Sequence, residues 1–233
     1  MMAVVLAGGI GSRLMPYTEE LPKPLVKVAD KPILEYILHL LKKNNFEQVI
    51  LAVNHKAQMI KETIGDGSRF GLEINYSEED QPLSTVAPLK LIDNLDDDFL
   101  VINGDVLTDL NFRQLFDFHR EHKNLITVAA HLRSNKIDYG LLHIDDNSHL
   151  VGFEEKPKSD YLVSMGVYLF SKTVLDLIPE NRPFGFDNLM DLLLEQKRPV
   201  SVYQYRGYWR DIGRVEDYLA VQEETEQIKK FLE

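Results

Sequence analysis

The sequence contains no cysteine among its 233 residues. Disulfide bonds, thiolate nucleophiles and cysteine-based zinc sites are therefore excluded. It also lacks any run of about 18 apolar residues, which a membrane-spanning helix would need. The apolar start, Met1 to Ala7, follows no basic segment and indicates a first strand rather than a signal peptide. We therefore expect a cytoplasmic protein with no membrane partner.

Basic residues are scarce, since 26 Lys and Arg stand against 37 Asp and Glu, for a net charge of -11. Nucleic-acid-binding proteins usually have the opposite balance, so we expect no nucleic-acid partner. An acidic protein can still bind phosphates through local cations and backbone amides. Each candidate cation must therefore be identified individually.

The hydrophobic content of 44% and the absence of repeats or biased segments favour one α/β domain over residues 1–233. In the first half, apolar strand patterns alternate with helical patterns, which is typical of a parallel sheet. The expected strands there are 3–6, 48–53, 72–76 and 99–102. The expected helices are 33–41, 56–64, 86–92 and 112–122.

The second half is richer in strands. The expected strands are 125–130, 140–144, 150–154, 161–170 and 200–205, with helices over 189–195 and 215–230. The predicted fold class is therefore α/β, with a Rossmann-like mixed, mainly parallel sheet flanked by helices and a small antiparallel portion.

A glycine-rich loop follows the first strand, at residues 8–11. Glycines there let the backbone approach a ligand and direct N–H groups toward phosphate oxygens. The dinucleotide fingerprint is not met, because Leu14 stands where it needs glycine, and no P-loop Gly-Lys-Ser/Thr occurs. Arg13 and Lys23 are the nearest cations. Taken alone, this stretch fits either a third kind of phosphate loop or a rigid turn with a solvated lysine.

Two carboxylates are candidate metal ligands. Asp105 belongs to the segment Asn103-Gly104-Asp105, which directly follows the strand 99–102 at the edge where open α/β sheets bind ligands. Asp211 precedes the last predicted helix. Mg²⁺ prefers such hard oxygen ligands, but a turn at Asp105 and a helix cap at Asp211 are simpler alternatives. The two residues are 106 positions apart, so only the fold decides whether they meet.

A third polar motif, Glu154-Glu155-Lys156-Pro157, closes the predicted strand 150–154. A carboxylate can accept hydrogen bonds from two sugar hydroxyls, and a lysine can hold a phosphate. In an ideal strand Glu155 and Lys156 point to opposite faces, so a local distortion before Pro157 is needed for both to reach one ligand. A solvated charged turn is the alternative interpretation.

Residues 6–14, Pro16, Thr18 and 22–25 together resemble the signature of the sugar-1-phosphate nucleotidylyltransferases. The resemblance covers nearly the whole chain and is strongest to the catalytic domain of mannose-1-phosphate guanylyltransferase and glucose-1-phosphate thymidylyltransferase-like members. It implies transfer of a nucleoside monophosphate from an NTP to a sugar 1-phosphate, with Mg²⁺ and with release of pyrophosphate.

The resemblance also assigns residues. The implied catalytic residues are Arg13, Lys23, Asp105, Lys156 and Asp211, with Asp105 and Asp211 as the metal ligands. The implied nucleotide-binding residues are Leu6, Ala7, Gly8, Gly9, Gly11, Ser12, Arg13, Lys23, Ser84, Thr85, Asn103 and Gly104. The implied sugar-phosphate-binding residues are Gly140, Glu155, Lys156 and Ser164.

Three positions depart from the family pattern. Ser84 and Ala87 replace glycines that lie against the nucleobase in the family, and Ser164 replaces an asparagine that contacts the sugar. The chain resembles the guanylyltransferase branch of the family most in its overall spacing, which implies GTP, while dTTP, UTP and CTP stay open, as does the sugar. A non-catalytic paralogue that binds nucleotide sugars is the second hypothesis, and the retained carboxylates and cations count against it.

Two further enzyme classes are weighed. A cofactor guanylyltransferase or cytidylyltransferase of similar fold would not be expected to have the 154–157 motif. A glycosyltransferase needs Asp-x-Asp after a strand, whereas residues 96–98 precede one. The chain ends soon after Trp209, so we expect no C-terminal β-helix domain, and a homodimer is the expected assembly.

Overall fold

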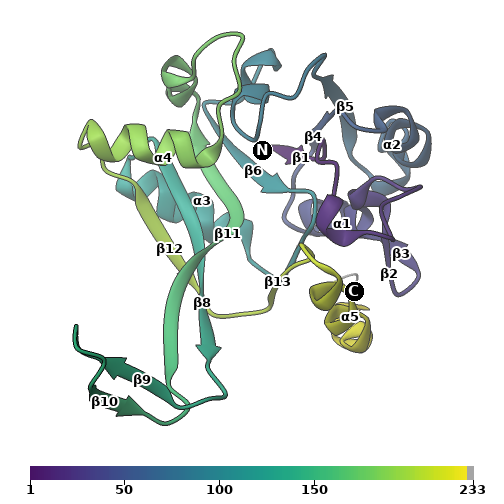
Figure 1. Ribbon diagram of the computed structural model, residues 1–233. Coiled ribbons are helices and arrows are strands. Elements are labelled where there is room, and N and C mark those ends of the chain that lie inside the picture. The colour runs from purple at the N-terminus through teal and green to yellow at the C-terminus, as the bar shows by residue number, and fades with distance from the viewer. Residues whose placement is uncertain (230–233) are drawn as a thin grey trace.

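A seven-stranded sheet organises the protein, seen in a computed structural model that describes residues 1–229 (Figure 1). In spatial order its strands are β12 (Ser201–Tyr205), β8 (Ile126–Lys136), β11 (Lys158–Ser171), β6 (Asp98–Asn103), β1 (Met2–Leu6), β4 (Gln48–Val53) and β5 (Glu73–Glu78). Four of the six adjacent pairs are parallel, and only β11 runs against its two neighbours. The predicted mixed, mainly parallel sheet is confirmed.

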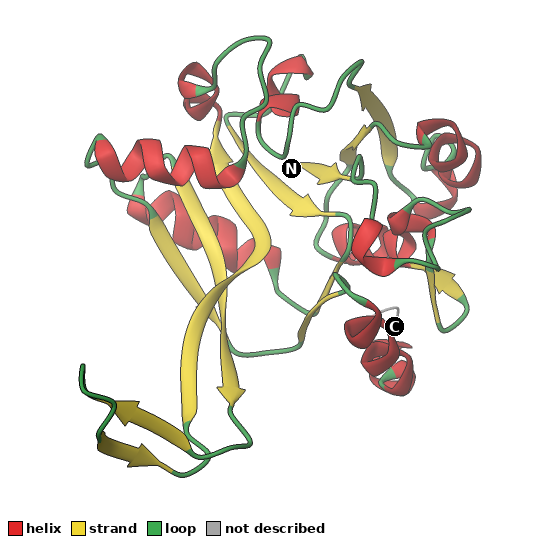
Figure 2. Cartoon of the chain, in the orientation of Figure 1, coloured by secondary structure: helices red, strands yellow, loops and turns green. Residues whose placement is uncertain are grey.

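Alternation along the central strands divides the apolar side chains between two cores. Ala3 and Val5 of β1 face one core, whereas Met2 and Val4 face the other. The side chains of successive strand residues point to opposite faces, so one buried strand supplies both cores. Figure 2 shows helices on both sides of the sheet, which is the layering this arrangement requires.

The helices cover the two faces unequally. Their bounds are α1 (Ile33–Lys43), α2 (Ala57–Ile64), α3 (Phe112–His122), α4 (Phe186–Glu195), α5 (Val215–Glu223) and α6 (Thr225–Lys229). Buried residues of α1, α2, α3, α5 and α6 join one core, and those of α4 join the other. No helix within residues 1–229 has the length and apolar character needed to cross a membrane.

Two predicted helices differ from the observed ones. The segment expected at 86–92 is a short 3₁₀ helix, Ala87–Leu91, whose Pro88 has no N–H to donate. The helix expected over 215–230 is interrupted at Glu224, which is the C-cap of α5. The Glu224 carboxylate accepts hydrogen bonds from Tyr208 and Arg210. Lys230 lies outside the described residues.

Strand β8 continues six residues past its predicted end at 130, and β11 begins three residues before its predicted start at 161. Their ladder continues past the sheet to the pair Lys136 and Lys158 and carries a hairpin of β9 (Leu141–Ile144) and β10 (Leu150–Glu154). In Figure 1 this hairpin projects beyond the ends of both strands. We call residues 132–163 the arm. Its side chains are mostly exposed, so no alternation of apolar residues extended the predicted strands 125–130 and 161–170 to the observed ends at Lys136 and Lys158.

A small ladder brings the end of the chain to the end of β6. Strand β13 (Trp209–Asp211) pairs antiparallel with β7 (Val106–Thr108), and Asp211 lies opposite Val106. The other short ladder joins β2 (Lys27–Val28) to β3 (Lys31–Pro32). The β7–β13 ladder therefore places Asp211 next to the loop that contains Asp105.

Candidate active site

The loops after β1, β4 and β6 meet at one edge of the sheet, because parallel strands end on the same side. They enclose a cavity of about 520 Å³ lined by residues 6–13, Lys23 and residues 103–105, among others. The loops approach closely: a Cβ on Gly104 would lie 2.8 Å from the carbonyl oxygen of Leu6. This cavity contains every nucleotide-binding position expected from the sequence.

The glycine loop is folded tightly over Lys23. Gly11 has a φ of 71°, and a Cβ there would lie 3.0 Å from Thr18 Cγ2 and 3.1 Å from Lys23 Cβ. The buried Thr18 hydroxyl donates to the Gly11 carbonyl oxygen at 2.8 Å. A glycine is therefore required by both conformation and space, and the turn leaves Lys23 and Arg13 facing the cavity.

Lys23 forms an ion pair with Asp105. Both side chains are largely buried, with 11% and 20% of their surfaces exposed. Lys23 bonds only Oδ2, and Asp105 Oδ1 is buried without a hydrogen-bond partner among the described residues. A buried, unpaired carboxylate oxygen is costly unless a further cation or donor binds it.

Asp211 lies beside this pair. The Ile212 amide donates to the Asp105 carbonyl oxygen at 3.0 Å, which fixes the two backbone segments together. Burial, and then the charge of Asp105, raises the pKa of Asp211 to about 6, while Lys23 and Arg13 act to lower it. The structure thus brings together two carboxylates, with Lys23 bound to one of them.

This donor set fits Mg²⁺. Mg²⁺ is usually bound by one or two carboxylates, with waters and substrate phosphates completing its octahedral shell. Within residues 1–229 no group of three or more His, Cys, Asp or Glu residues could hold a metal. Asp105 and Asp211 would therefore hold the ion together with substrate oxygens.

The segment after β5 forms another part of the cavity wall. Ser84 and Thr85 line it, and Thr85 Oγ1 accepts from the Phe186 amide at 2.9 Å. Ser84 adopts a φ of 70°, so the backbone keeps a conformation typical of the glycine in the family pattern. Ala87, by contrast, is buried in the hydrophobic core and does not line the cavity.

Sequence reasoning missed three polar residues that line the cavity: Asn54, His55 and Glu79. Asn54 and His55 follow β4, and Glu79 follows β5. They stand after parallel strands, as Asp105 does, so the strand-end rule could have found them. They were missed because no glycine or charge motif accompanies them.

The sugar-side residues lie apart from this cavity. Gly140, Glu155 and Lys156 belong to the arm and do not line it. Gly140 and Glu155 are close neighbours, since a Cβ on Gly140 would lie 3.4 Å from Glu155 Oε2. Lys156 has a φ of 46°, so the backbone departs from ideal strand geometry just before Pro157.

Ser164 connects the base of the arm with the carboxylates. Its hydroxyl donates to the Tyr168 hydroxyl at 3.1 Å. Burial, followed by the charges of Asp105 and Asp211, raises the pKa of Tyr168. Tyr168 and Ser164 therefore lie near the metal-ligand candidates, between the cavity and the arm.

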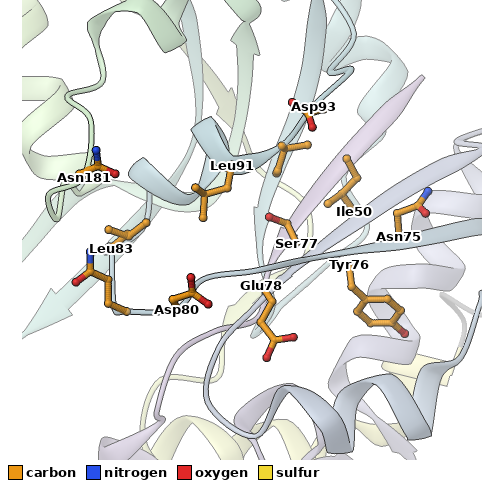
Figure 3. Close-up of a pocket in the computed structure, with 12 residues that line it drawn as sticks. Ile50, Asn75, Tyr76, Ser77, Glu78, Asp80, Leu83, Leu91, Asp93 and Asn181 are labelled. Carbon is orange, nitrogen blue, oxygen red and sulfur yellow. The ribbon is translucent and has the colours of Figure 1, made fainter.

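A second cavity, of about 560 Å³, lies beside β5 and is shown in Figure 3. Glu78, Asp80 and Asp93 line it, together with amides and aliphatic side chains. No lysine or arginine does so, and it is therefore unsuited to a triphosphate despite its size. The phosphate chemistry belongs to the cavity of the glycine loop.

Comparison with known proteins identifies the family of the chain. The family model described as "Nucleotidyl transferase" matches residues 2–228, and the chain belongs to this family. The catalytic subunit beta of mannose-1-phosphate guanylyltransferase from Drosophila melanogaster is 36% identical over 224 residues, covering 93% of this chain and 60% of that protein. The UTP–glucose-1-phosphate uridylyltransferase of Synechocystis is 32% identical over 238 residues, covering 94% and 61%.

The chain thus spans about 60% of the length of these curated relatives. Among solved structures, HddC of Yersinia pseudotuberculosis in complex with GMP-PN superposes with a TM-score of 0.75 at 25% identity, covering 96% of this chain and 98% of that one. The resemblance to sugar-1-phosphate nucleotidylyltransferases that the sequence indicated is confirmed at the level of the family.

Proposed function

We propose that this chain transfers a nucleoside monophosphate from an NTP, preferably GTP, to a sugar 1-phosphate, giving a nucleotide sugar and pyrophosphate. One observation carries the proposal: the fold brings Lys23, Asp105 and Asp211 together beside the glycine loop. A site that only bound a nucleotide sugar would not need two crowded carboxylates. Their arrangement therefore favours catalysis over the non-catalytic alternative.

The reaction would need no protein nucleophile. A phosphate oxygen of the sugar 1-phosphate attacks the α-phosphorus in line, and the bond from that phosphorus to the bridging oxygen of pyrophosphate breaks. Loop amides and Arg13 would hold the β- and γ-phosphates, and Lys23 would neutralise charge at the α-phosphate. Bound by Asp105 and Asp211, Mg²⁺ would supply further charge neutralisation.

The sugar phosphate would enter from the arm. Glu155 would accept hydrogen bonds from sugar hydroxyls with Gly140 beside it, and Lys156 would hold the phosphate. Ser164 would contact the sugar near Tyr168. The arm residues do not line the nucleotide cavity, so this role requires the two substrates to meet between the arm and the carboxylates.

The proposed preference for GTP is drawn from relatives that include both guanylyltransferases and a uridylyltransferase. Mannose-1-phosphate guanylyltransferases from Drosophila melanogaster and Mycobacterium tuberculosis are 36% and 34% identical to the chain, and a UTP–glucose-1-phosphate uridylyltransferase is 32% identical. HddC was solved with GMP-PN. A single domain over residues 1–233, a homodimer and a cytoplasmic location stay predictions.

The test is pyrophosphate release from GTP and mannose 1-phosphate in the presence of Mg²⁺. We expect Asp105→Ala to lower kcat by at least about 100-fold, as the loss of a group that stabilises transition-state charge does. Asp96→Ala changes an exposed aspartate in the loop before β6; it is the matched control and should keep full activity. Near-normal turnover by Asp105→Ala would reject the metal role.

A further inference from the structure

Lys56 connects two of the loops around the nucleotide cavity. It is the third residue after β4, and its neighbour His55 lines the cavity. The Lys56 ammonium group donates to the carbonyl oxygen of Glu19 at 2.6 Å and to that of Thr18 at 3.3 Å. Both carbonyl groups belong to the segment that follows the glycine loop. One side chain therefore joins this segment to the loop after β4.

The backbone of Lys56 lies in the left-handed region, with a φ of 55° and a ψ of 33°. Glycine and asparagine adopt this conformation more readily than lysine does. Lys56 is also the N-cap of α2, where its side chain makes no capping hydrogen bond. Neither the turn nor the helix end therefore accounts for a lysine here, whereas the length and charge of its side chain suit the two carbonyl oxygens.

A short series of contacts leads from Lys56 to the glycine loop. Thr18, whose carbonyl oxygen accepts from Lys56, is buried and donates its hydroxyl to the Gly11 carbonyl oxygen at 2.8 Å. Gly11 in turn packs against Lys23, since a Cβ on Gly11 would lie 3.1 Å from Lys23 Cβ. Within the described part of the chain, Lys56 is not among the residues that line the cavity. Its influence on a ligand there would pass through Thr18 and Gly11.

We infer that Lys56 is a positioning residue, which holds the glycine loop in the shape that binds a triphosphate. The inference rests on the proposed nucleotidylyl transfer, in which the loop amides and Arg13 hold the β- and γ-phosphates. Several amides bond one phosphate chain only when the loop is correctly placed, so a small displacement weakens all of these bonds together. Loss of the Lys56 contacts should therefore weaken triphosphate binding, whatever the base, and spare monophosphate binding.

The test measures the affinities of GTP, UTP, GMP and UMP by calorimetry, with Mg²⁺ and without sugar phosphate. Lys56→Asn keeps the left-handed conformation, which asparagine tolerates, but its side chain is too short to reach Glu19. This variant should bind triphosphate roughly 10-fold more weakly, the equivalent of one hydrogen bond to a charged group, and bind monophosphate within about twofold of wild type. Lys56→Arg keeps the charge and the reach and should restore triphosphate binding.

Lys123→Asn is the matched control, because Lys123 has the same left-handed conformation, with a φ of 53°, away from the cavity. It should leave all the affinities unchanged. Equal weakening of triphosphate and monophosphate by Lys56→Asn would indicate general damage to the fold and would overturn the inference. An unchanged triphosphate affinity would overturn it as well.

A double-variant cycle separates positioning of the loop from direct contact with phosphate. Thr18→Val removes the hydroxyl that bonds Gly11, so it should weaken triphosphate binding through the same loop. If Lys56 acts through Thr18, the variant with both changes should bind triphosphate within about threefold of the weaker single variant. Independent effects would multiply instead, and that result would assign Lys56 directly to a phosphate and overturn the inference.

The same measurements distinguish this inference from the proposed function. If the wild-type chain releases pyrophosphate and Lys56→Asn binds triphosphate as the wild type does, only the role of Lys56 fails. If the wild-type chain binds none of the nucleotides, the proposed function fails as well.

Discussion

Among single residues, Ser84 combines an unusual conformation with a place in the site. Its φ of 70° lies in the left-handed region, which costs a residue with a side chain on the order of 1 kcal/mol. Its hydroxyl lies close to the backbone of Gly185, since a Cβ on that glycine would lie 2.9 Å from Ser84 Oγ. The substitution of glycine by serine therefore changes the shape of the cavity wall without changing the path of the backbone.

We expect Ser84→Gly to raise the free energy of unfolding by up to about 1 kcal/mol, because glycine relieves the left-handed strain. Urea denaturation with an unchanged m value measures this. Lys123→Gly is the control, since Lys123 has a φ of 53° after α3, away from the cavity. Both should stabilise the fold, and only Ser84→Gly should change nucleotide affinity. A loss of stability at Ser84 would contradict this account.

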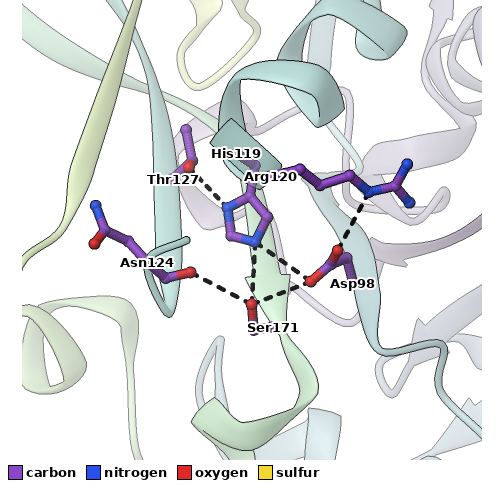
Figure 4. A network of polar contacts seen from close by, with 6 residues as sticks. All are labelled: Asp98, His119, Arg120, Asn124, Thr127 and Ser171. Carbon is purple, nitrogen blue, oxygen red and sulfur yellow. Dashed lines mark hydrogen bonds and ion pairs between the residues drawn. The ribbon is translucent and has the colours of Figure 1, made fainter. Parts of the chain in front are cut away.

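Among elements, helix α3 is attached to the sheet by a buried histidine. His119 is 2% exposed, its Nδ1 lies 2.8 Å from Thr127 Oγ1, and its Nε2 lies 3.1 Å from Ser171 Oγ (Figure 4). Asp98, at the start of β6, lies 3.6 Å from Nε2 and also contacts Arg120. Burial lowers the pKa of His119 more than Asp98 raises it.

This lowered pKa predicts a loss of stability in acid. The unfolded histidine, with a pKa of about 6.5, binds a proton more readily than the folded one. The contribution of His119 is therefore fully present above about pH 6.5 and is lost as the pH falls toward the folded pKa. Its slope is at most about 1.4 kcal/mol per pH unit.

The measurement is the Tm of wild type and of His119→Gln between pH 7.5 and 5.0. The variant should melt lower at pH 7.5 and show a shallower decline toward acid. His149→Gln, on an exposed side chain of the arm, should leave the wild-type slope unchanged. Parallel curves for wild type and His119→Gln would show that protonation of His119 does not destabilise the fold.

At the scale of the whole molecule, the two expected substrate sites are built from different elements of the fold. The nucleotide cavity is built on the ends of β1, β4 and β6, whereas Glu155 and Lys156 belong to the arm that projects from β8 and β11. Substrate binding to the arm should therefore be separable from nucleotide binding.

We expect Lys156→Met to raise the KM for the sugar 1-phosphate about 10-fold, because one cation of the phosphate site is lost. The Kd for GTP should stay within about twofold. Lys158→Met, two residues along on the same arm, is the control and should change neither constant. Initial rates and calorimetry give the two values. A weaker GTP affinity with an unchanged KM would place Lys156 on the nucleotide instead.

The sequence by itself determined the central strands and their helices. Residues 48–53 and 112–122 were predicted with their observed bounds, because buried parallel strands are continuous apolar runs and amphipathic helices repeat every 3.6 residues. The glycine loop and its two cations were also readable, since φ and close approach restrict such positions to particular residues.

Only the tertiary structure decided which distant residues meet. The β7–β13 ladder brought Asp211 next to Asp105. In the segment at the end of β5, Glu79 lines the nucleotide cavity, whereas Glu78 lines the second cavity. Long exposed strands formed the arm. A local sequence pattern reflects the burial and the backbone conformation of its own residues. The contacts between these distant residues depend on long-range pairing between strands, which no local pattern specifies.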